Sequence, residues 1–431
     1  MLRGDSVRPL AAAVMGICVT LLAATYTAQA SYVAAQGGWP PPFDLSQSVD
    51  ETSIGPDLAM AQNGDLHVIW MEPGGVTFTV YHAGSDDQGS NWVYSVPLTP
   101  ADNHRYEAAV DVDQLGVVHA VWREQPGDHQ LWYGQLLRGS WKETMITQTE
   151  MITRYVQSPG VVVTADFLHA VWSETNFGLG SQLDVFYSRS ESGGEWSPAT
   201  TTVETKATSL GSRVAADTAG NLHLVWQESP MGKPYQIYYI SGTVETGESA
   251  ETVWSMPITV SAGLTQTATT PDIAVGSDNT VHVVFGVNVE NEPDVQDLYY
   301  ASFPVTDAEV VSATLIPGTR VKVSGLLPNY ASPALAVLGT DEVHVAWNGM
   351  IGDDYADRIY YVVSKDGGAS WSDPVPVSPR DTEPHGFPSL AVDGVFVHVV
   401  WQEKVSDTDE DILYTRRFPI SLSLPLTLKA Y

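Results

Sequence analysis

Basic and aromatic side chains that could bind an anionic ligand recur along this chain of 431 residues. The predicted ligand-binding residues are Arg105, Arg154, Arg213, Arg380 and His385. A guanidinium group offers a planar fork of donors that suits a carboxylate. Two of the arginines precede a tyrosine, so the candidate catalytic residues of a hydrolase would be Arg105, Tyr106, Glu107, Arg154, Tyr155 and Arg213. The alternative interpretation is a set of scattered, solvated arginines.

Seven histidines, spaced 50 to 62 residues apart, suggest a second kind of chemistry, metal coordination. They are His67, His119, His169, His223, His282, His344 and His398. Six stand three residues before a tryptophan, and His282 stands before Phe285. Copies separated by a whole repeat cannot converge on one ion unless they line a common axis. We therefore interpret the histidines, and the Trp-x-Glu that follows in five copies, as structural, and we expect no metal site.

The period indicates a repeat architecture, and each copy carries the signals of four strands. Strand a is an apolar run, and a turn such as Gly64-Asp65 leads into strand b with its His-x-x-Trp. Strand c contains a tyrosine, and strand d begins with tryptophan and often contains proline, which suits an edge strand. The predicted tyrosines are Tyr81, Tyr133, Tyr187, Tyr239, Tyr300, Tyr361 and Tyr414.

This pattern predicts an all-β fold, a seven-bladed β-propeller of four-stranded antiparallel blades, with a six-bladed ring as the alternative. The propeller is expected to span residues 31–417, with repeats at about 55–100, 106–149, 157–204, 211–262, 269–325, 331–378 and 386–417. The last repeat lacks a tryptophan-led strand d, whereas residues 39–47 have that pattern alone. We expect this N-terminal segment to close the last blade. The C-terminal tail, residues 418–431, is the rival candidate.

Composition and the chain ends bear on location and partners. Residues 1–30 resemble a cleaved signal peptide, with an uncleaved membrane anchor as the alternative, and the single cysteine, Cys18, lies within them. The mature chain is then expected to be secreted or on the cell surface, monomeric and without a transmembrane segment. A net charge of −31 argues against binding to nucleic acid.

Two turns between strands c and d share the pattern Ser-x-Asp-x-Gly-x-x-Trp. Their residues are Ser85, Asp87, Gly89 and Trp92 in the first turn, and Ser364, Asp366, Gly368 and Trp371 in the second. The aspartate can accept backbone N–H groups within the turn, and glycine supplies an unusual φ. The pattern resembles the Asp-box, or bacterial neuraminidase repeat, of sialidase-superfamily propellers. That resemblance implies a sialidase-like ring with these turns on the face opposite any active site.

The resemblance also implies three arginines, one in a Phe-Arg-Ile-Pro-like segment, together with a tyrosine–glutamate pair and an acid/base aspartate. No Phe-Arg-Ile-Pro segment occurs in this sequence. Connections from d to a and from b to c should share the other face, where departures from the repeat are informative. Three b-to-c connections there are acidic, at residues 290–297, 353–357 and 407–411. Solvated charge explains them without a cofactor, and a calcium site is the alternative.

These observations favour an exported, sialidase-like binding or interaction module for glycans or cell-surface material. A diverged exo-glycosidase acting on terminal acidic sugars and a structural cell-surface protein are the alternatives. The missing catalytic segment argues against an enzyme.

Overall fold

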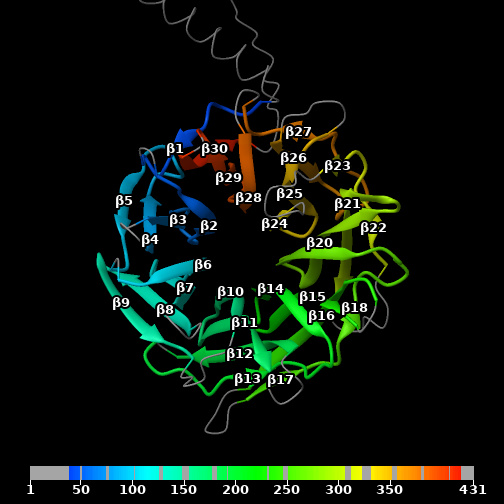
Figure 1. The fold of residues 1–431 in the computed structure, drawn as a ribbon, viewed down its shortest axis with the longest axis horizontal. Helices are drawn as coiled ribbons and strands as arrows, with labels where there is room; N and C mark the ends of the chain where they lie inside the picture. The colour runs from blue at the N-terminus through cyan, green and yellow to red at the C-terminus, as the bar shows by residue number, and fades with distance from the viewer. Residues whose placement is uncertain are drawn as a thin grey trace, which may run out of the picture.

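The computed structural model describes residues 38–48, 51–73, 77–100, 102–125, 130–147, 155–176, 182–191, 193–230, 233–245, 251–305, 312–322, 332–351, 357–379, 383–406 and 408–418. The predicted signal peptide and residues 419–431 lie outside this part of the chain. The regular elements in the described residues are β-strands, arranged as seven antiparallel sheets around a central axis (Figure 1). The predicted seven-bladed propeller is therefore confirmed, and the six-bladed alternative is wrong.

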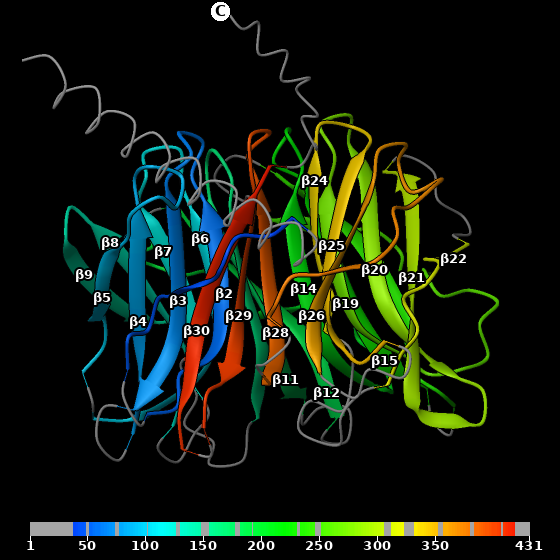
Figure 2. The same cartoon turned by 90° about the horizontal axis from the view of Figure 1, so that it is seen from above.

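The blades follow one another around the ring. Seen from the side, their strands run roughly along the axis of the ring (Figure 2). Blades 1 to 3 consist of β2 (Ile54–Met60), β3 (Leu66–Pro73), β4 (Phe78–Ser85) and β5 (Val93–Pro97); β6 (His104–Val112), β7 (Val118–Gln125), β8 (Gln130–Leu137) and β9 (Ser140–Met145); and β10 (Val156–Val163), β11 (Leu168–Asn176), β12 (Gln182–Ser190) and β13 (Thr200–Thr201). Blades 4 and 5 consist of β14 (Thr208–Ala216), β15 (Leu222–Ser229), β16 (Gln236–Val244), β17 (Thr252–Trp254) and β18 (Ile258–Thr259); and β19 (Ala268–Val275), β20 (Thr280–Val289), β21 (Glu292–Pro304), β22 (Thr314–Leu315) and β23 (Val321–Lys322). Blades 6 and 7 consist of β24 (Ala334–Leu338), β25 (Glu342–Gly349), β26 (Arg358–Ser364) and β27 (Val375–Pro376); and β28 (Glu383–Val392), β29 (Val397–Lys404), β30 (Glu410–Arg417) and β1 (Phe43–Asp44).

The N-terminal strand closes the ring, as its sequence predicts. β1 pairs antiparallel with β30, with Phe43 opposite Tyr414, so the last blade is built from both ends of the propeller. Trp39 is fully buried beside this junction and meets Tyr361 edge to face at 5.4 Å between ring centroids. Closure pairs the outer edge of β30, which would otherwise expose unpaired backbone groups.

The repeated histidine ties strand b to strand c. In six blades its Nδ1 is hydrogen-bonded to the hydroxyl of the strand c tyrosine: His119–Tyr133 at 2.7 Å, His169–Tyr187 at 2.9 Å, His223–Tyr239 at 2.8 Å, His282–Tyr300 at 2.5 Å, His344–Tyr361 at 2.6 Å and His398–Tyr414 at 2.8 Å. The structural interpretation of the series is therefore correct for these six blades.

Blade 1 departs from this pattern. Tyr81 lies opposite Trp70 in the sheet, one register position away from the expected place, which His82 occupies. The prediction that Tyr81 belongs to the tyrosine series is wrong, because a one-residue difference in a strand places the side chain on the other face of the sheet.

The tryptophan of strand b donates its indole N–H to the glutamate two residues later in five blades. The pairs are Trp70–Glu72, Trp122–Glu124, Trp172–Glu174, Trp226–Glu228 and Trp401–Glu403. Residues two apart on a strand lie on one face, so the spacing allows this contact. These carboxylates belong to the scaffold, as the sequence indicates.

Neighbouring blades are joined by aromatic contacts. A strand c tyrosine meets an aromatic ring of the following blade edge to face, with centroids 4.8 to 5.4 Å apart: Tyr133–Trp196, Tyr187–Trp254, Tyr239–Phe303, Tyr300–Trp371, Tyr361–Trp39 and Tyr414–Trp92. Such pairs contribute about 0.5–1.5 kcal/mol each beyond the area they bury. The seven buried hydrophobic clusters of the described residues each combine side chains from two neighbouring blades.

Candidate functional site

A shallow hollow opens on the face that carries the d-to-a and b-to-c connections, here called the d–a face. It is lined by Tyr155, Gln157, Thr175, Leu183 and Thr208. Tyr155 immediately precedes β10, and the other four residues lie at the beginnings of β10, β12 and β14 and near the end of β11, so the hollow lies between blades 3 and 4. Departures from the repeat on this face were expected to be informative, and Tyr155 was already a candidate residue.

Backbone pairing fixes the entry of β10 at this hollow. The Tyr155 N–H donates to Thr175 Oγ1 at 3.1 Å, and the Thr175 N–H donates back to the Tyr155 carbonyl at 3.2 Å. The Tyr155 side chain is 55% exposed. An exposed aromatic ring beside amide and hydroxyl groups offers an apolar surface together with fixed donors and acceptors, the usual composition of a small-ligand site.

A β-bulge shapes the entry of six of the seven innermost strands. At each bulge, one residue of the innermost strand has positive φ: Gly55 (61°), Glu107 (48°), Ser158 (50°), Gly211 (63°), Thr270 (50°) and Phe387 (52°). Four of these residues are not glycine, so the conformation costs of order 1 kcal/mol at each and is maintained by its surroundings. The bulge recurs and belongs to the architecture, whereas its side chains differ from blade to blade.

Hydrogen bonds across the blades hold these bulges. Glu107 Oε2 accepts the N–H of Ser158 in the next blade at 2.7 Å, and Ser212 Oγ donates to the Ser158 carbonyl at 2.9 Å. Gln227 and Gln402 likewise accept the bulge N–H groups of Thr270 and Gly55. The segment that carries Gln157 into the hollow is therefore fixed from both neighbouring blades.

Carboxylates also link the innermost strands around the axis. Asp57 Oδ2 accepts the N–H of Val110 at 2.9 Å, Asp111 Oδ2 that of Val163 at 2.7 Å, and Asp272 Oδ2 that of Leu335 at 2.7 Å. Burial raises the pKa of Asp57, and it raises the pKa of Asp111 and of Asp272 to about 6. Each of these carboxylates therefore hydrogen-bonds its own innermost strand to the innermost strand of the next blade.

Arg213 places a positive charge near the carboxylates of the innermost strands. It stands at the same strand position as Asp57 and Asp272, and its side chain is exposed. Its positive charge opposes the effect of burial on the pKa of both carboxyls. Arg213 therefore neutralises part of the negative charge around the axis.

Of the four predicted arginines, the structure describes Arg105 and Arg213, and these two have different surroundings. Arg105 is 2% exposed, and its guanidinium contacts Asp102 at 3.0 Å, Glu124 at 3.1 Å and the Pro100 carbonyl at 2.5 Å. All these partners lie in the same blade or just before it, so this side chain supports the entry of β6. Arg154 and Arg380 lie outside the described residues, as does the side chain of His385.

Tyr106 and Glu107 belong to a rim on the d–a face. Arg123 lies over the Tyr106 ring, 4.9 Å from its centroid, and pairs with Glu107 at 3.3 Å. His104 stacks on Tyr106 at 5.8 Å between ring centroids. The glutamate bonds to an arginine and to a backbone N–H, and the structure records no hydrogen bond between it and Tyr106.

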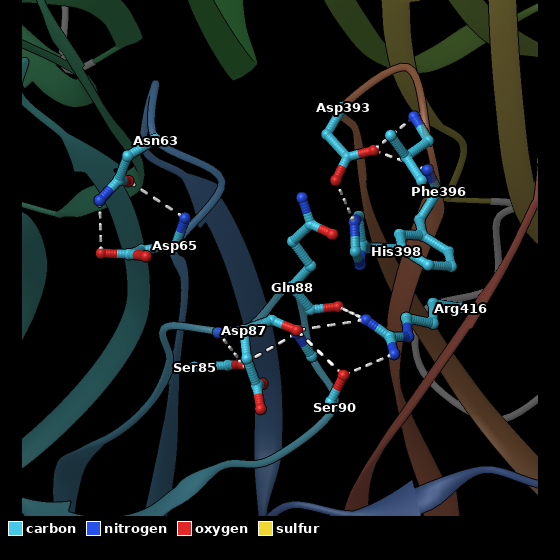
Figure 3. A network of polar contacts seen from close by, with 12 residues as sticks. Asn63, Asp65, Ser85, Asp87, Gln88, Ser90, Asp393, Phe396, His398 and Arg416 are labelled. Carbon is cyan, nitrogen blue, oxygen red and sulfur yellow. Dashed lines mark hydrogen bonds and ion pairs between the residues drawn. The ribbon is translucent and has the colours of Figure 1, made fainter.

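The two Ser-x-Asp-x-Gly-x-x-Trp turns share one hydrogen-bond pattern on the opposite face. In the first turn, Ser85 Oγ donates to Asp87 Oδ1 at 2.9 Å and the Gly89 N–H donates to Ser85 Oγ at 2.8 Å, and Ser364, Asp366 and Gly368 repeat these contacts. Figure 3 shows Arg416 of blade 7 reaching the first turn, where it donates to the Gln88 carbonyl and to Ser90 Oγ. In the second turn, the Gly367 carbonyl accepts a hydrogen bond from the Tyr300 hydroxyl of blade 5, so both turns join neighbouring blades.

Two aspartates of the acidic b-to-c connections have polar partners in the described residues. Asp297 forms a two-point ion pair with Arg320, and Asp411 Oδ1 accepts hydrogen bonds from Ser46 and Ser48. Asp353 and Asp407 lie outside the described residues. Within the described part of the chain, no group of three or more His, Cys, Asp or Glu residues is arranged to hold a metal ion.

Sequence reasoning missed four of the five residues that line the hollow. In the sequence nothing distinguishes Gln157, Thr175, Leu183 and Thr208 from other strand residues. The one signal that could have identified them as site residues is their position at strand ends on the d–a face. It also missed Asp57, Asp111 and Asp272 as links between innermost strands.

The sequence matches no known protein-family model and no curated protein sequence. Among solved structures, the chain is similar to an ulvan lyase, a polysaccharide lyase bound to an oligosaccharide of GlcA and Rha3S, with a TM-score of 0.58 and 11% identity over 86% of this chain and 95% of the other. It is also similar to an α-L-arabinanase of Penicillium chrysogenum in complex with arabinobiose, with a TM-score of 0.50 and 17% identity over 77% of this chain and 99% of the other. An α-L-arabinofuranosidase of Fusarium graminearum in complex with arabinobiose has a TM-score of 0.50 and 11% identity, over 88% of this chain and 98% of the other. At these identities the similarity shows a shared propeller fold.

No helix in the described residues is long and apolar enough to cross a membrane.

Proposed function

We propose that this chain is an exported glycan-binding propeller and that a saccharide binds in the hollow between blades 3 and 4. The observation that carries the proposal is the composition of the hollow: one exposed tyrosine, one amide, two threonine hydroxyls and one leucine. An aromatic ring packs against the C–H face of a sugar, while amide and hydroxyl groups satisfy the sugar hydroxyls. The carbohydrate-active propellers of similar fold support a glycan as the class of ligand.

The hollow favours a neutral part of a glycan. None of its five lining residues carries a charge at neutral pH. The whole chain has a net charge of −31, which repels an anionic polymer at low salt. Arg105, predicted to bind an acidic sugar, is bonded within its own blade. Export and a sialidase-like ancestry remain part of the proposal and rest on the N-terminal sequence and on the two shared turns.

Glycan-array binding by the purified protein tests this function. We expect binding to neutral oligosaccharides, weakened about tenfold by Tyr155→Ala, a loss equivalent to about 1.4 kcal/mol. Leu115→Ala is the control, because Leu115 is 88% exposed and lies in the a-to-b turn on the opposite face. Binding that Tyr155→Ala leaves unchanged, or the absence of binding to any glycan, would refute the proposal.

A hydrolase is the second candidate, and one observation favours it. Asp111 and Asp272 lie on innermost strands with pKa values near 6, which suits a carboxylic acid that donates a proton near neutral pH. Each also accepts a backbone N–H group, however, which explains its presence structurally. Release of a fluorogenic aglycone from arabinosides and sialosides would support this candidate if Asp272→Asn abolished the release and left the melting temperature unchanged.

A further inference from the structure

Blade 1 contains a pair of histidines where the other six blades contain a histidine and a tyrosine. His82 lies opposite Ile69 in the sheet, the same register that places Tyr133 opposite Val121 in blade 2. The Nδ1 atom of His67 and the Nε2 atom of His82 are 3.0 Å apart. The rings are nearly parallel, with centroids 5.3 Å apart and planes inclined by 19°. Two imidazole nitrogens therefore face each other at this one position of the ring.

The separation of these nitrogens is suitable for chelation. A metal ion bound to two imidazoles at about 2.0–2.1 Å holds their nitrogens about 2.9–3.4 Å apart when the angle at the metal is near 90–110°. Modest rotation of each ring would direct both lone pairs to one point. A hydroxyl in place of His82, as in the other blades, would supply a much weaker ligand for such an ion.

The chain also leaves room beside the pair. Gly84 lies directly opposite His67, a position filled in the other blades by Gln135, Arg189, Ser241, Ser302, Val363 and Arg416. A Cβ atom at Gly84 would lie 3.5 Å from His67 Nδ1 and 3.4 Å from His82 Cε1. The other six blades have a side chain at this position, whereas Gly84 has none, so only this blade lacks a side chain against the two rings.

Both rings lie largely away from solvent: His82 is 8% exposed and His67 is half-buried. In blades 2, 4 and 7 the turn aspartate lies 3.4 to 3.6 Å from the Nε2 atom of the strand b histidine. Ala61 takes the place of that aspartate in blade 1, and Asp65 instead stands two residues before His67, the spacing at which Glu342 lies 3.5 Å from His344 Nε2 in blade 6. A carboxylate so placed can orient a metal-bound imidazole.

We infer that His67 and His82 form a two-imidazole site for a divalent late transition-metal ion, of the class of Zn²⁺ and Cu²⁺, with water in the space beside Gly84. In the free protein, one of the facing nitrogens carries the proton that forms the hydrogen bond. On binding, that proton moves to the opposite nitrogen of the same ring, so both facing nitrogens become ligands and no net proton is released. This inference is independent of the proposed glycan function, because the pair lies on a different blade from the hollow.

Titration calorimetry of the untagged protein with ZnCl₂ at pH 7.5 tests the site. We expect one Zn²⁺ per chain, and His82→Tyr, which restores the residue of the other blades, should weaken binding at least about tenfold. CaCl₂ and MgCl₂ should not bind there, because hard cations require oxygen ligands. His104→Tyr on the d–a face is the matched control and should bind Zn²⁺ like the wild type. Absence of Zn²⁺ binding, or equal binding by His82→Tyr, would overturn the inference.

A second variant tests the open space while keeping both histidines. Gly84→Gln copies the residue of blade 2 and should also weaken Zn²⁺ binding at least about tenfold. Electron paramagnetic resonance of one equivalent of Cu²⁺ should show coupling to two imidazole nitrogens in the wild type. A spectrum with one nitrogen or none would refute the site even if His82→Tyr fails to fold.

Discussion

Replacement of Trp39 by alanine should open the ring at its closing blade. The Trp39 side chain is fully buried, meets Tyr361 at 5.4 Å and lies under the Arg417 guanidinium, 4.6 Å from its ring. It also belongs to the hydrophobic cluster of Ile359, Val399 and Trp401 between blades 6 and 7. Truncation of a buried tryptophan costs about 3–5 kcal/mol, from lost transfer energy and the cavity that remains.

A matched variant separates closure from ordinary packing. Trp196 makes the equivalent edge-to-face contact with Tyr133 at 5.1 Å, but it is half-buried and its blade is continuous in sequence. Trp196→Ala should therefore cost about 1–2 kcal/mol, less than Trp39→Ala.

Equilibrium unfolding in urea measures the two variants. We expect the midpoint of Trp39→Ala to lie well below that of Trp196→Ala. Limited proteolysis of Trp39→Ala should cut first in the segment preceding β2, because release of β1 exposes both ends of the last blade. Equal midpoints, with no new cleavage near β1, would refute the idea that the N-terminal strand holds the ring closed.

Further predictions concern charge, backbone strain and pH. Arg105→Met should destabilise the protein by about 3–5 kcal/mol in urea unfolding, because Glu124 loses its buried partner, whereas an arginine used only for ligand binding would leave stability unchanged. Ser158→Gly should raise the free energy of unfolding by up to about 1 kcal/mol, since glycine adopts a φ of 50° without the cost that serine incurs; a loss of stability in urea unfolding would contradict this. The melting temperature should fall as the pH drops from 7 to 4. Burial lowers the pKa of His82, His169 and His344 to about 3 and that of His282 and His398 to about 4. Below pH 6.5 these histidines therefore bind more protons in the unfolded chain than in the folded one, which destabilises the fold. Asp111, Asp272 and Asp411 have pKa values raised to about 6, so between pH 6 and 4 they bind more protons in the folded state and stabilise it. These three carboxyls are fewer than the five histidines, so a melting temperature that rose on acidification would contradict the prediction.

The seven-bladed ring could be predicted from the periodicity of the sequence. The His-x-x-Trp period, the turn glycines and the tryptophan at residue 39 are local signals that each blade needs in order to form its own strands, so they recur and can be read directly. The same recurrence identified the histidines and the Trp-x-Glu carboxylates as scaffold, and the hydrogen bonds of His119 and Glu124 confirm it. The N-terminal closure followed because one blade lacked a strand that the other end of the chain supplied.

Tertiary structure alone decided how side chains are used where blades meet. Arg105 and Arg213 look alike in the sequence, yet one is buried in an ion pair and the other lies exposed among carboxylates of other blades. Likewise, Tyr81 and His82 exchange roles because strand register, which depends on pairing with β3, sets the face on which each side chain lies. The hollow brings Tyr155 and Thr208 together from two blades across about fifty residues of sequence. Such contacts depend on the packing of neighbouring sheets, which a periodic sequence pattern does not encode.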